Sequence, residues 1–465
     1  MVNPHQRLAA LGTAIPEIIF PGPETDPEKW AVIACDQFTQ DREYWNAVRR
    51  TVGDAPSALD LIFPEVYLGD PDREERIRRI HRSMDRYLGD GALSPPRRCA
   101  VYIERSTPRH PRRRGLLLAV DLERYDWTPG ARFLIRSTEG TVPERLPPRM
   151  EVRRGAALEI PHILLLIDDD EDALLPALGE RAGQNPPRYE SPLMFGAGSV
   201  KGWTLDRESD WDLLAGGLEA LARRAGTRYG RHDPEPFLFA VGDGNHSLAT
   251  AKAVWEEYKA AHRGEPVLAE HGARWALVEV ENLYDPAVGF EPIHRILFGV
   301  RMDEILGILS RLPGFSARSI GKDDAAGARR ELSRLVGDPG AGGNRLGLIS
   351  GGELTLVESD APGLATDSLQ PLLDAFIAAD KNPDKPADAG KAPVSIDYIH
   401  GEEELFRLAG PGSPAPALGI LLPPIRKTGL FETVARSGPL PRKSFSMGEA
   451  GEKRFYFEAR KLFPR

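Results

Sequence analysis

The stretch that decides the fold is "FLFAVGDGNHSLATAKAVWEEYKAA", residues 237–261. An apolar run ends at Val241, and apolar residues at helical spacing begin at Leu248. The residues between them, Gly-Asp-Gly-Asn-His-Ser, predict a tight turn from a strand into a helix. By pattern alone, this junction is as compatible with a plain turn as with a working site.

Five residues of this turn favour the working site. Asp243 or Asn245 is expected to cap the helix, and Gly242 and Gly244 permit backbone conformations that a Cβ would hinder. The unpaired amides at a helix start, together with the helix dipole, form a pocket for phosphate or carboxylate. Asp243 beside His246 adds a carboxylate and an imidazole, which could orient a metal ion or move a proton.

The composition is that of a folded protein with an acidic surface. The 465 residues are 41% hydrophobic and 28% charged, and the net charge is -9 with a pI near 5.7. The length predicts several lobes, and the acidic balance disfavours general duplex-DNA binding. No apolar run approaches the roughly 20 residues of a membrane span and no signal-peptide pattern opens the chain, so a cytoplasmic protein is expected. Two cysteines, Cys35 and Cys99, fit neither a disulfide framework nor a cysteine-rich zinc site.

Outside the opening stretch, the chain mixes strand and helix patterns without a regular βαβ period, so an α+β fold with mixed sheets and flanking helices is predicted. Residues 70–88 place Ile77, Ile80, Met84 and Leu88 at helical spacing, with arginines expected on a solvated opposite face. Residues 337–344 and 379–393 are rich in proline, glycine and aspartate and predict surface loops.

Three lobes are expected. They are a β-rich α+β lobe over residues 1–130, a core lobe over 131–300 that carries the RSTEGT and GDGNHS motifs, and a C-terminal α+β lobe over 301–465. The last lobe is predicted to end in a hairpin, because the alternating runs 443–447 and 453–462 flank the turn "GEAGE". The oligomeric state is not readable from the sequence.

Three further clusters could carry chemistry. In residues 135–154, glutamates and arginines crowd a proline-interrupted segment that leaves a strand; the arginine forks suit phosphate or carboxylate, and a charged surface loop is the alternative. His294 and Arg295 lie between apolar residues, where a structural histidine is the alternative. Residues 439–463 hold Arg442, Lys443, Lys453 and Arg454, which could close a cationic pocket. The common nucleotide-binding and hydrolase signatures are absent from the sequence.

Several long motifs, in order, carry a resemblance to a known family. They are residues 30–45, 61–68, 136–149, 241–252, 291–297 and 441–462. With them the chain resembles, over nearly its whole length, the family catalogued as domain of unknown function 1015. That name implies no activity.

A more distant resemblance concerns the opening turn. Members of that family carry Asp-Gly-His-His-Arg there, which is similar to the phosphate-contacting motif of the ParB/sulfiredoxin superfamily, a group that includes an ADP-dependent free-serine kinase. The resemblance implies a ParB/sulfiredoxin-like core, with residues Asp243 to Ser247 facing a phosphorylated ligand. In this sequence, Asn245 replaces the first histidine and Ser247 replaces the arginine. Without that arginine, the motif lacks the guanidinium group that would bind a phosphate. The motif also contains no cysteine, so sulfiredoxin-type reduction is not expected.

The leading hypothesis is an enzyme that acts on a phosphorylated small molecule or nucleotide by kinase-like phosphotransfer, with magnesium and a nucleotide as the expected cofactors. Asp243 would hold the divalent ion or orient the acceptor, His246 would contact phosphate or shuttle a proton, and Glu139 would be the base. The expected substrate-binding and phosphate-binding residues are Arg136, Arg145, Arg149, Gly244, Asn245, Ser247, His294, Arg295 and Lys443.

Two other classes of function stay open. A non-catalytic protein could use the same pocket to bind a ligand or a partner. ParB-like nucleic-acid binding is disfavoured by the acidic charge and by the lack of a helix-turn-helix signal.

Overall fold

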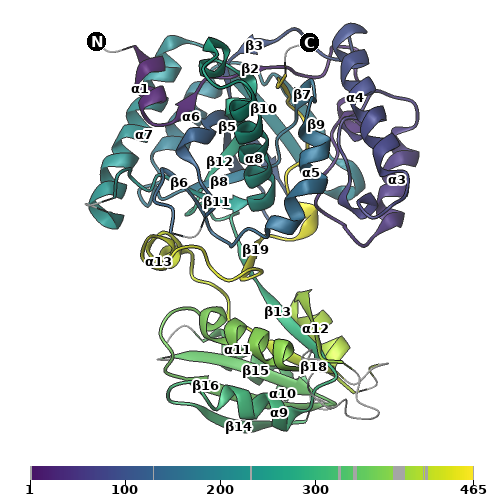
Figure 1. Cartoon of the computed structure of the whole chain (residues 1–465), viewed down its shortest axis with the longest axis vertical. Coiled ribbons are helices and arrows are strands. Elements are labelled where there is room, and N and C mark those ends of the chain that lie inside the picture. The colour runs from purple at the N-terminus through teal and green to yellow at the C-terminus, as the bar shows by residue number, and fades with distance from the viewer. Residues whose placement is uncertain are drawn as a thin grey trace. The chain divides into compact units, whose positions relative to one another are not determined.

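The chain folds into two compact units, each built around its own sheet (Figure 1). The first unit comprises Met1–Gly289, Thr428–Pro439 and Ala450–Arg465, and the second comprises Phe290–Lys427 and Leu440–Glu449. The computed structural model describes residues 3–128, 130–230, 233–322, 326–338, 343–380, 393–411, 413 and 417–463. Both units combine helices with mixed or antiparallel sheets, which confirms the predicted α+β class.

The first unit contains a nine-stranded sheet whose main path runs β6-β11-β8-β12-β5-β4-β10-β9, with β1 paired to β5. The β6–β11 and β12–β8 pairs are parallel, and the other pairs are antiparallel. The strands are β1 (Thr13–Ala14), β4 (Ala100–Ser106), β5 (Arg113–Asp121), β6 (Ile135–Ser137), β8 (Leu164–Ile167), β9 (Tyr189–Pro192), β10 (Ser199–Leu205), β11 (Phe239–Asp243) and β12 (Trp275–Asn282). Two small pairs complete the unit, namely β2 (Glu17–Ile18) with β3 (Arg97–Arg98) and β7 (Leu158–Glu159) with β20 (Arg460–Lys461).

Helices cover this sheet with the apolar faces that their sequences predict. Helix α8 buries Leu248, Ala251 and Trp255, which lie on one stripe of a 3.6-residue period, and it packs against α5. Helix α4 buries Ile77, Ile80 and Met84 as expected. The helices are α1 (Pro4–Ala10), α2 (Pro27–Trp30), α3 (Arg42–Val52), α4 (Arg73–Gly89), α5 (Leu146–Arg153), α6 (Leu174–Ala182), α7 (Glu208–Tyr229), α8 (Asn245–Ala261) and α13 (Leu430–Ser437).

The second unit is an antiparallel sheet of order β14-β16-β15-β18-β13-β17, with β19 paired to the start of β13. Alternation along β13 sends Leu297 into a core shared with α9 and α11 and Ile296 into another shared with α10 and α12. The strands are β13 (Phe290–Phe298), β14 (Ser316–Lys322), β15 (Asn344–Ser350), β16 (Glu353–Ser359), β17 (Ser395–His400), β18 (Ala417–Leu421) and β19 (Phe445–Met447). The helices are α9 (Met302–Leu309), α10 (Ala326–Gly337), α11 (Ala365–Asp380) and α12 (Glu402–Ala409).

This division differs from the three lobes expected from the sequence. Strands from residues 1–130 and from 131–300 join one sheet, because β5 pairs with β12 over its length. A lobe boundary near residue 130 would cut through that sheet. The second boundary lies close to the observed one, since the first unit's long segment ends at Gly289.

The predicted C-terminal hairpin is also wrong. Its first arm, β19, pairs with β13 in the second unit. Its second arm lies in the first unit, where Phe455 bridges to Ile33 and Ala459 bridges to Ile19. The alternation that suggested a hairpin arises because each arm pairs separately with a different strand partner.

Two further expectations from the sequence concern surface loops and membrane-spanning segments. Most of the expected loops 337–344 and 379–393 lies outside the described residues. In the part of the chain that is described, no helix is both long and apolar enough to cross a membrane.

Candidate functional site

The two motifs singled out in the sequence lie next to each other in the first unit. Strands β6 and β11 are parallel neighbours, with Ser137 opposite Val241. The hydroxyl of Thr138 donates to the carbonyl of Val241 at 2.6 Å, and the amide of Val142 donates to Nε2 of His246 at 3.3 Å. The loop after β6, which contains Glu139, therefore packs against the start of α8.

The start of α8 is an open helix N terminus. Gly244 precedes it with φ +79°, and a Cβ there would lie 3.1 Å from the Cα of Ile163, so this position favours glycine. Neither Asp243 nor Asn245 caps the helix, because α8 has no side-chain cap. Among the described residues, the buried Oδ1 of Asn245 has no hydrogen-bond partner. The Gly244 amide donates to Asp243, and the positive end of the helix dipole at this uncapped start favours a negative group.

A lysine from the C-terminal segment, residues 450–463, lies beside this turn. Nζ of Lys453 is 2.9 Å from Oδ2 of Asp243, and the side chain of Lys453 is 6% exposed. Burial raises the pKa of Asp243, but the Lys453 ammonium and the Gly244 amide outweigh it and hold that pKa below its usual value. Asp243 is consequently an anion near neutral pH, and Lys453 supplies a buried positive charge next to it.

A chain of hydrogen bonds ends on Ser247. The amide of Cys35 donates to the hydroxyl oxygen of Tyr456 at 3.0 Å, and that oxygen lies 2.8 Å from Nδ1 of His162. Nε2 of His162 lies 2.7 Å from Oγ of Ser247. Burial raises the pKa of Tyr456 far above its ordinary value, so the phenol keeps its single proton.

The hydrogen-bond directions on both sides of His162 depend on its tautomer. With the proton on Nε2, Nδ1 accepts from the Tyr456 hydroxyl and Nε2 donates to Oγ of Ser247, which leaves the hydroxyl proton of Ser247 for an acceptor beside the start of α8. With the proton on Nδ1, His162 donates to the Tyr456 oxygen and accepts from Ser247.

Carboxylates flank His162 on the side of the N-terminal segment. Oδ2 of Asp36 is 3.9 Å from Nε2 of His162. Glu65 holds Arg149 in a bidentate pair at 2.7 and 2.5 Å, and burial raises the pKa of Glu65 despite that arginine. Burial also raises the pKa of the neighbouring Cys35 thiol, which keeps it protonated and poorly nucleophilic.

The other arginines predicted for this site lie elsewhere in the first unit. Arg136 is buried in a 2.6 Å pair with Asp233, and its guanidinium lies over the ring of Phe237. Arg145 is exposed at the start of α5, where its carbonyl accepts from Arg149. Of the predicted arginines in this unit, Arg149 is the one held near His162, through Glu65.

Three predicted site residues belong to the second unit. Nδ1 of His294 accepts from the amide of Leu422 at 3.1 Å, and burial lowers the pKa of His294 to about 4. Arg295 is fully buried, and its Nε donates to Gln370 at 2.9 Å. Lys443 follows β18 and α13 in the chain and has a positive φ of 58°. The site described above is built from the first unit alone.

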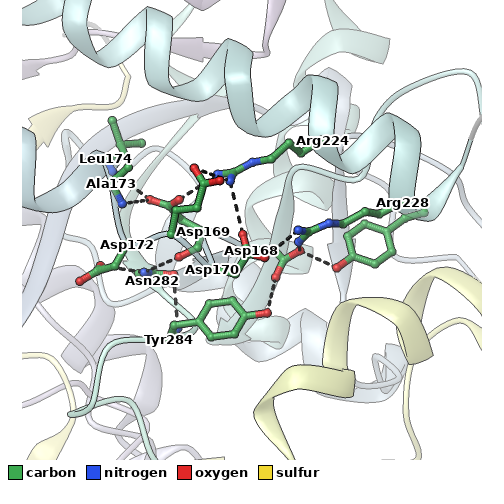
Figure 2. A network of polar contacts seen from close by, with 12 residues as sticks. Asp168, Asp169, Asp170, Asp172, Ala173, Leu174, Arg224, Arg228, Asn282 and Tyr284 are labelled. Carbon is green, nitrogen blue, oxygen red and sulfur yellow. Dashed lines mark hydrogen bonds and ion pairs between the residues drawn. The ribbon is translucent and has the colours of Figure 1, made fainter.

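The acidic run after β8 is a second cluster of charged groups in the first unit (Figure 2). Asp169 accepts from the amides of Ala173 and Leu174, both at 2.8 Å, and pairs with Arg224 at 2.9 Å. Asp168 accepts from the side chains of Tyr229, Tyr284 and Arg228. Asp170 accepts from Arg224 and Arg228. These carboxylates are engaged in holding α6 and α7 to the sheet.

The described residues contain no group of three or more His, Cys, Asp or Glu side chains that could hold a metal ion. Asp243, the predicted ligand, already engages Lys453 and the Gly244 amide. Magnesium commonly binds through one or two carboxylates plus substrate phosphates. The side chains here do not by themselves form a protein-built magnesium site, and the role of Asp243 toward a metal stays a prediction.

Sequence reasoning missed two members of this cluster, His162 and Tyr456, and chose Lys443 where the structure places Lys453. His162 comes two residues before an apolar strand, which gave no signal of its own. Both Lys453 and Tyr456 lie within the C-terminal motif, but their pairing depends on where the chain returns to the first unit.

Comparisons with known proteins place the chain in a wider context. The sequence model of the family described as "Protein of unknown function (DUF1015)" matches residues 19–337. No curated protein matches the chain.

Solved structures resemble this fold only weakly. A "conserved hypothetical protein from Pyrococcus furiosus" is 11% identical, with a TM-score of 0.35 over 75% of this chain and 95% of that one. A "free serine kinase in complex with AMP" is 10% identical, with a TM-score of 0.36 over 75% and 91%. "SbnI with C-terminal truncation from Staphylococcus aureus" is 10% identical, with a TM-score of 0.35 over 75% and 82%. Similarity at this level does not carry the activities of those proteins to this chain.

Proposed function

Because this chain belongs to the DUF1015 family, whose description gives no activity, we propose a function from the site itself. The protein is an enzyme that acts on a phosphorylated small molecule or nucleotide, by kinase-like phosphotransfer. The ligand's anionic group binds at the start of α8, between the Gly244 turn and Ser247.

The observation that carries the proposal is the series of hydrogen-bonded contacts from Tyr456 through His162 to Ser247, at 2.8 and 2.7 Å, beside the start of α8. In the proposed state His162 carries its proton on Nε2 and donates to Ser247, so that the hydroxyl proton of Ser247 is left for a ligand. The start of α8 has no side-chain cap, and Asn245 there has a buried carbonyl oxygen without a partner among the described residues. Several hydrogen-bond donors directed at one place stabilise a bound anion. The Asn245 carbonyl oxygen beside them can accept a hydrogen bond from a hydroxyl group of the ligand.

Each group has a role in this proposal. Lys453 offsets negative charge on the phosphoryl group, as the cations of phosphotransfer sites do. Asp243 holds that lysine in place and orients the acceptor. His162 keeps Ser247 pointed at the ligand. His246 of α8 and Glu139 of the loop after β6 border the pocket, and the Val142 amide of that loop donates to His246. Magnesium, when it is brought by a nucleotide, would add charge neutralisation between the phosphates and the Asp243 carboxylate.

The alternative is a protein that binds the same ligand without turning it over. The mutual neutralisation of Asp243 by Lys453 and of Glu65 by Arg149 favours this alternative, because each partner is already satisfied. ParB-like nucleic-acid binding is the third class and predicts affinity that falls steeply with salt.

The test begins with a thermal-shift screen of the full chain against inorganic phosphate, nucleoside mono-, di- and triphosphates and sugar phosphates, each with and without magnesium. A selective ligand raises the apparent stability by mass action. Phosphorus NMR on the best ligand, with amino acids, sugars and water as acceptors, then detects transfer. The Tyr456→Phe variant keeps the ring but removes the hydroxyl that contacts Nδ1 of His162, and it should weaken binding of the selected ligand.

Three outcomes separate the hypotheses. Selective binding with transfer, weakened in Tyr456→Phe, supports the enzyme. Selective binding without transfer to any acceptor supports the ligand-binding protein. No stabilisation by any phosphorylated compound contradicts both.

A further inference from the structure

A second concave surface of the first unit lies between α3 and α4, outside the site above. It encloses a volume of about 750 Å³ and is lined by six arginines, Arg42, Arg49, Arg76, Arg79, Arg82 and Arg86. Asp60 is the one acidic residue among the lining side chains. The volume falls in the range of small-molecule sites, which is about 300–1,000 Å³.

The arginine side chains of this groove are held by surface carboxylates rather than buried. Arg42 and Arg76 approach Asp70, at 2.5 and 3.7 Å, and Arg79 lies 3.9 Å from Asp72. The side chains of these three arginines are 30% to 56% exposed, although that of Asp70 is 17% exposed. Ion pairs that water reaches in this way contribute little to stability. A ligand with several negative groups can therefore take over the guanidinium groups at little cost to the fold.

The floor of the groove is apolar and aromatic. Trp45, Phe63 and Ile80 line it, and Arg42 and Arg76 lie over the ring of Tyr67, with centroid distances of 5.3 and 4.2 Å. Such stacking presents the guanidinium edges as donors while the planes stay packed.

One buried donor in the floor lacks an acceptor. The side chain of Trp45 is 1% exposed, and its Nε1 has no hydrogen-bond partner among the described residues. A buried donor left unpaired costs free energy, and such groups are uncommon in folded proteins. A bound acceptor would remove that cost.

We propose that this groove, the α3–α4 arginine groove, binds a small molecule that carries at least two phosphate or carboxylate groups on an apolar or aromatic body. The anionic groups pair with the arginines, and the body covers the floor formed by Trp45, Phe63 and Ile80. The arginine face of α4, expected from the sequence to be merely solvated, is in this proposal one wall of a binding site. The site is separate from the one at the start of α8 and does not depend on the function proposed there.

The test is isothermal titration of the full chain with two probes, inorganic pyrophosphate and ATP without magnesium. Both are measured in wild type and in Ser247→Ala, so that binding at the start of α8 is recognised by its weakening in that variant. Binding in the groove should persist in Ser247→Ala, should be tighter for ATP than for pyrophosphate, and should weaken at least tenfold in the double variant Arg79→Glu, Arg86→Glu. Trp45→Phe keeps the packing and removes the donor, and it should weaken ATP severalfold.

The matched control is Arg78→Glu. Arg78 belongs to the same helix, is as exposed as Arg79, and has similar carboxylate neighbours, but it does not line the groove. This variant should change the affinity less than twofold. Equal weakening by Arg78→Glu and by the double variant would mean diffuse charge attraction and would overturn the proposal. It would also be overturned if neither probe bound in Ser247→Ala, or if a hexaglutamate peptide bound there more tightly than ATP.

Discussion

Two turns of the first unit, residues 168–173 after β8 and 243–245 after β11, lead from neighbouring strands of one sheet into helices. Both are rich in acidic or amide side chains. In the turn after β8, Asp169 accepts from two amides at the start of α6 (Figure 2). Arginines of α7 pair with Asp168, Asp169 and Asp170, and Asn282 donates to Asp172. In the turn after β11, α8 has no side-chain cap, and Asn245 keeps a buried oxygen without a partner among the described residues.

The two turns differ in the partners of their polar groups. In the turn after β8, the carboxylates accept hydrogen bonds from other residues of the first unit, so these acidic residues stabilise the fold. The turn after β11 leaves the start of α8 without a side-chain cap, while Lys453 contacts Asp243 and His162 contacts Ser247 from distant segments of the chain. A turn rich in acidic residues is therefore not by itself a ligand-binding site. A better indicator is whether its polar groups already have hydrogen-bond partners within the protein.

The largest effect that tests this comparison is on stability, in the turn after β8. Replacement of Asp169 by alanine removes the cap from two amides of α6 and leaves Arg224 without its buried partner. We expect a loss of roughly 3 kcal/mol in the free energy of unfolding. All seven tryptophans lie in the first unit, so tryptophan fluorescence during urea unfolding reports on that unit.

The matched control for Asp169→Ala is Asp170→Asn, in the same turn but with a side chain that is 36% exposed. It should cost well under 1 kcal/mol, because exposed ion pairs contribute little. Ligand binding at the start of α8 should be unchanged in both variants after correction for the folded fraction. Equal destabilisation by the two would show that Asp169 is not the structural anchor of this turn.

Local sequence patterns correctly predicted several of the strands and helices. The apolar run before Val241 and the helical spacing from Leu248 correctly gave β11 and α8, because both periodicities reflect one buried face. In α4 the same reasoning erred at Leu88, which is 38% exposed, while Tyr87 takes the buried position. The helix turns by 100° per residue, and one more step brings that side chain out to solvent.

The site depended on contacts that no local pattern contains. His162 and Tyr456 are 294 residues apart in the chain, and they meet because the C-terminal segment returns to the first unit after β19. For the same reason Lys453, not Lys443, reaches Asp243. The adjacency of the RSTEGT and GDGNHS motifs follows from parallel pairing of β6 with β11, and sequence patterns do not specify which strands pair.

A smaller effect is expected on ligand affinity, in the turn after β11. Ser247→Ala removes the last donor of the chain through Tyr456 and His162. The ligand found for this site should bind about tenfold more weakly, which is about 1.4 kcal/mol, because a hydrogen bond to a charged group is lost. The unfolding free energy should change little. Titration calorimetry and urea unfolding measure the two quantities.

Thr250→Val is the control for Ser247→Ala on the same helix. The Thr250 hydroxyl donates to the carbonyl of His246 at 2.7 Å, so it is satisfied within α8 and is not offered to a ligand. Affinity should be retained in this variant. If Ser247→Ala bound as tightly as wild type while Thr250→Val did not, the donors would be assigned to the wrong face of α8.

The smallest effect concerns the pH dependence of the turn after β8. The hydrogen bond from Arg228, together with the charges of Arg228 and Arg224, lowers the pKa of Asp170 and outweighs the opposing effect of burial. Since its pKa is lower in the folded state, this carboxylate stabilises the protein above its unfolded pKa of about 3.8, and the contribution is lost as the pH falls through the folded value. The gap in unfolding free energy between wild type and Asp170→Asn should therefore be constant from pH 7 to pH 5 and should shrink below pH 4.

Asp243 extends the same measurement to the turn after β11. Burial raises its pKa, but Lys453 and the Gly244 amide lower it further, so the sign of the pH dependence is the same. The gap between wild type and Asp243→Asn should be wider than for Asp170→Asn at pH 7, because Lys453 is buried and cannot be rehydrated when its partner is neutral. It too should narrow below pH 4. A gap that widened as the pH fell, in either turn, would mean that the carboxylate is protonated in the folded protein and that its arginine or lysine is bound to another group.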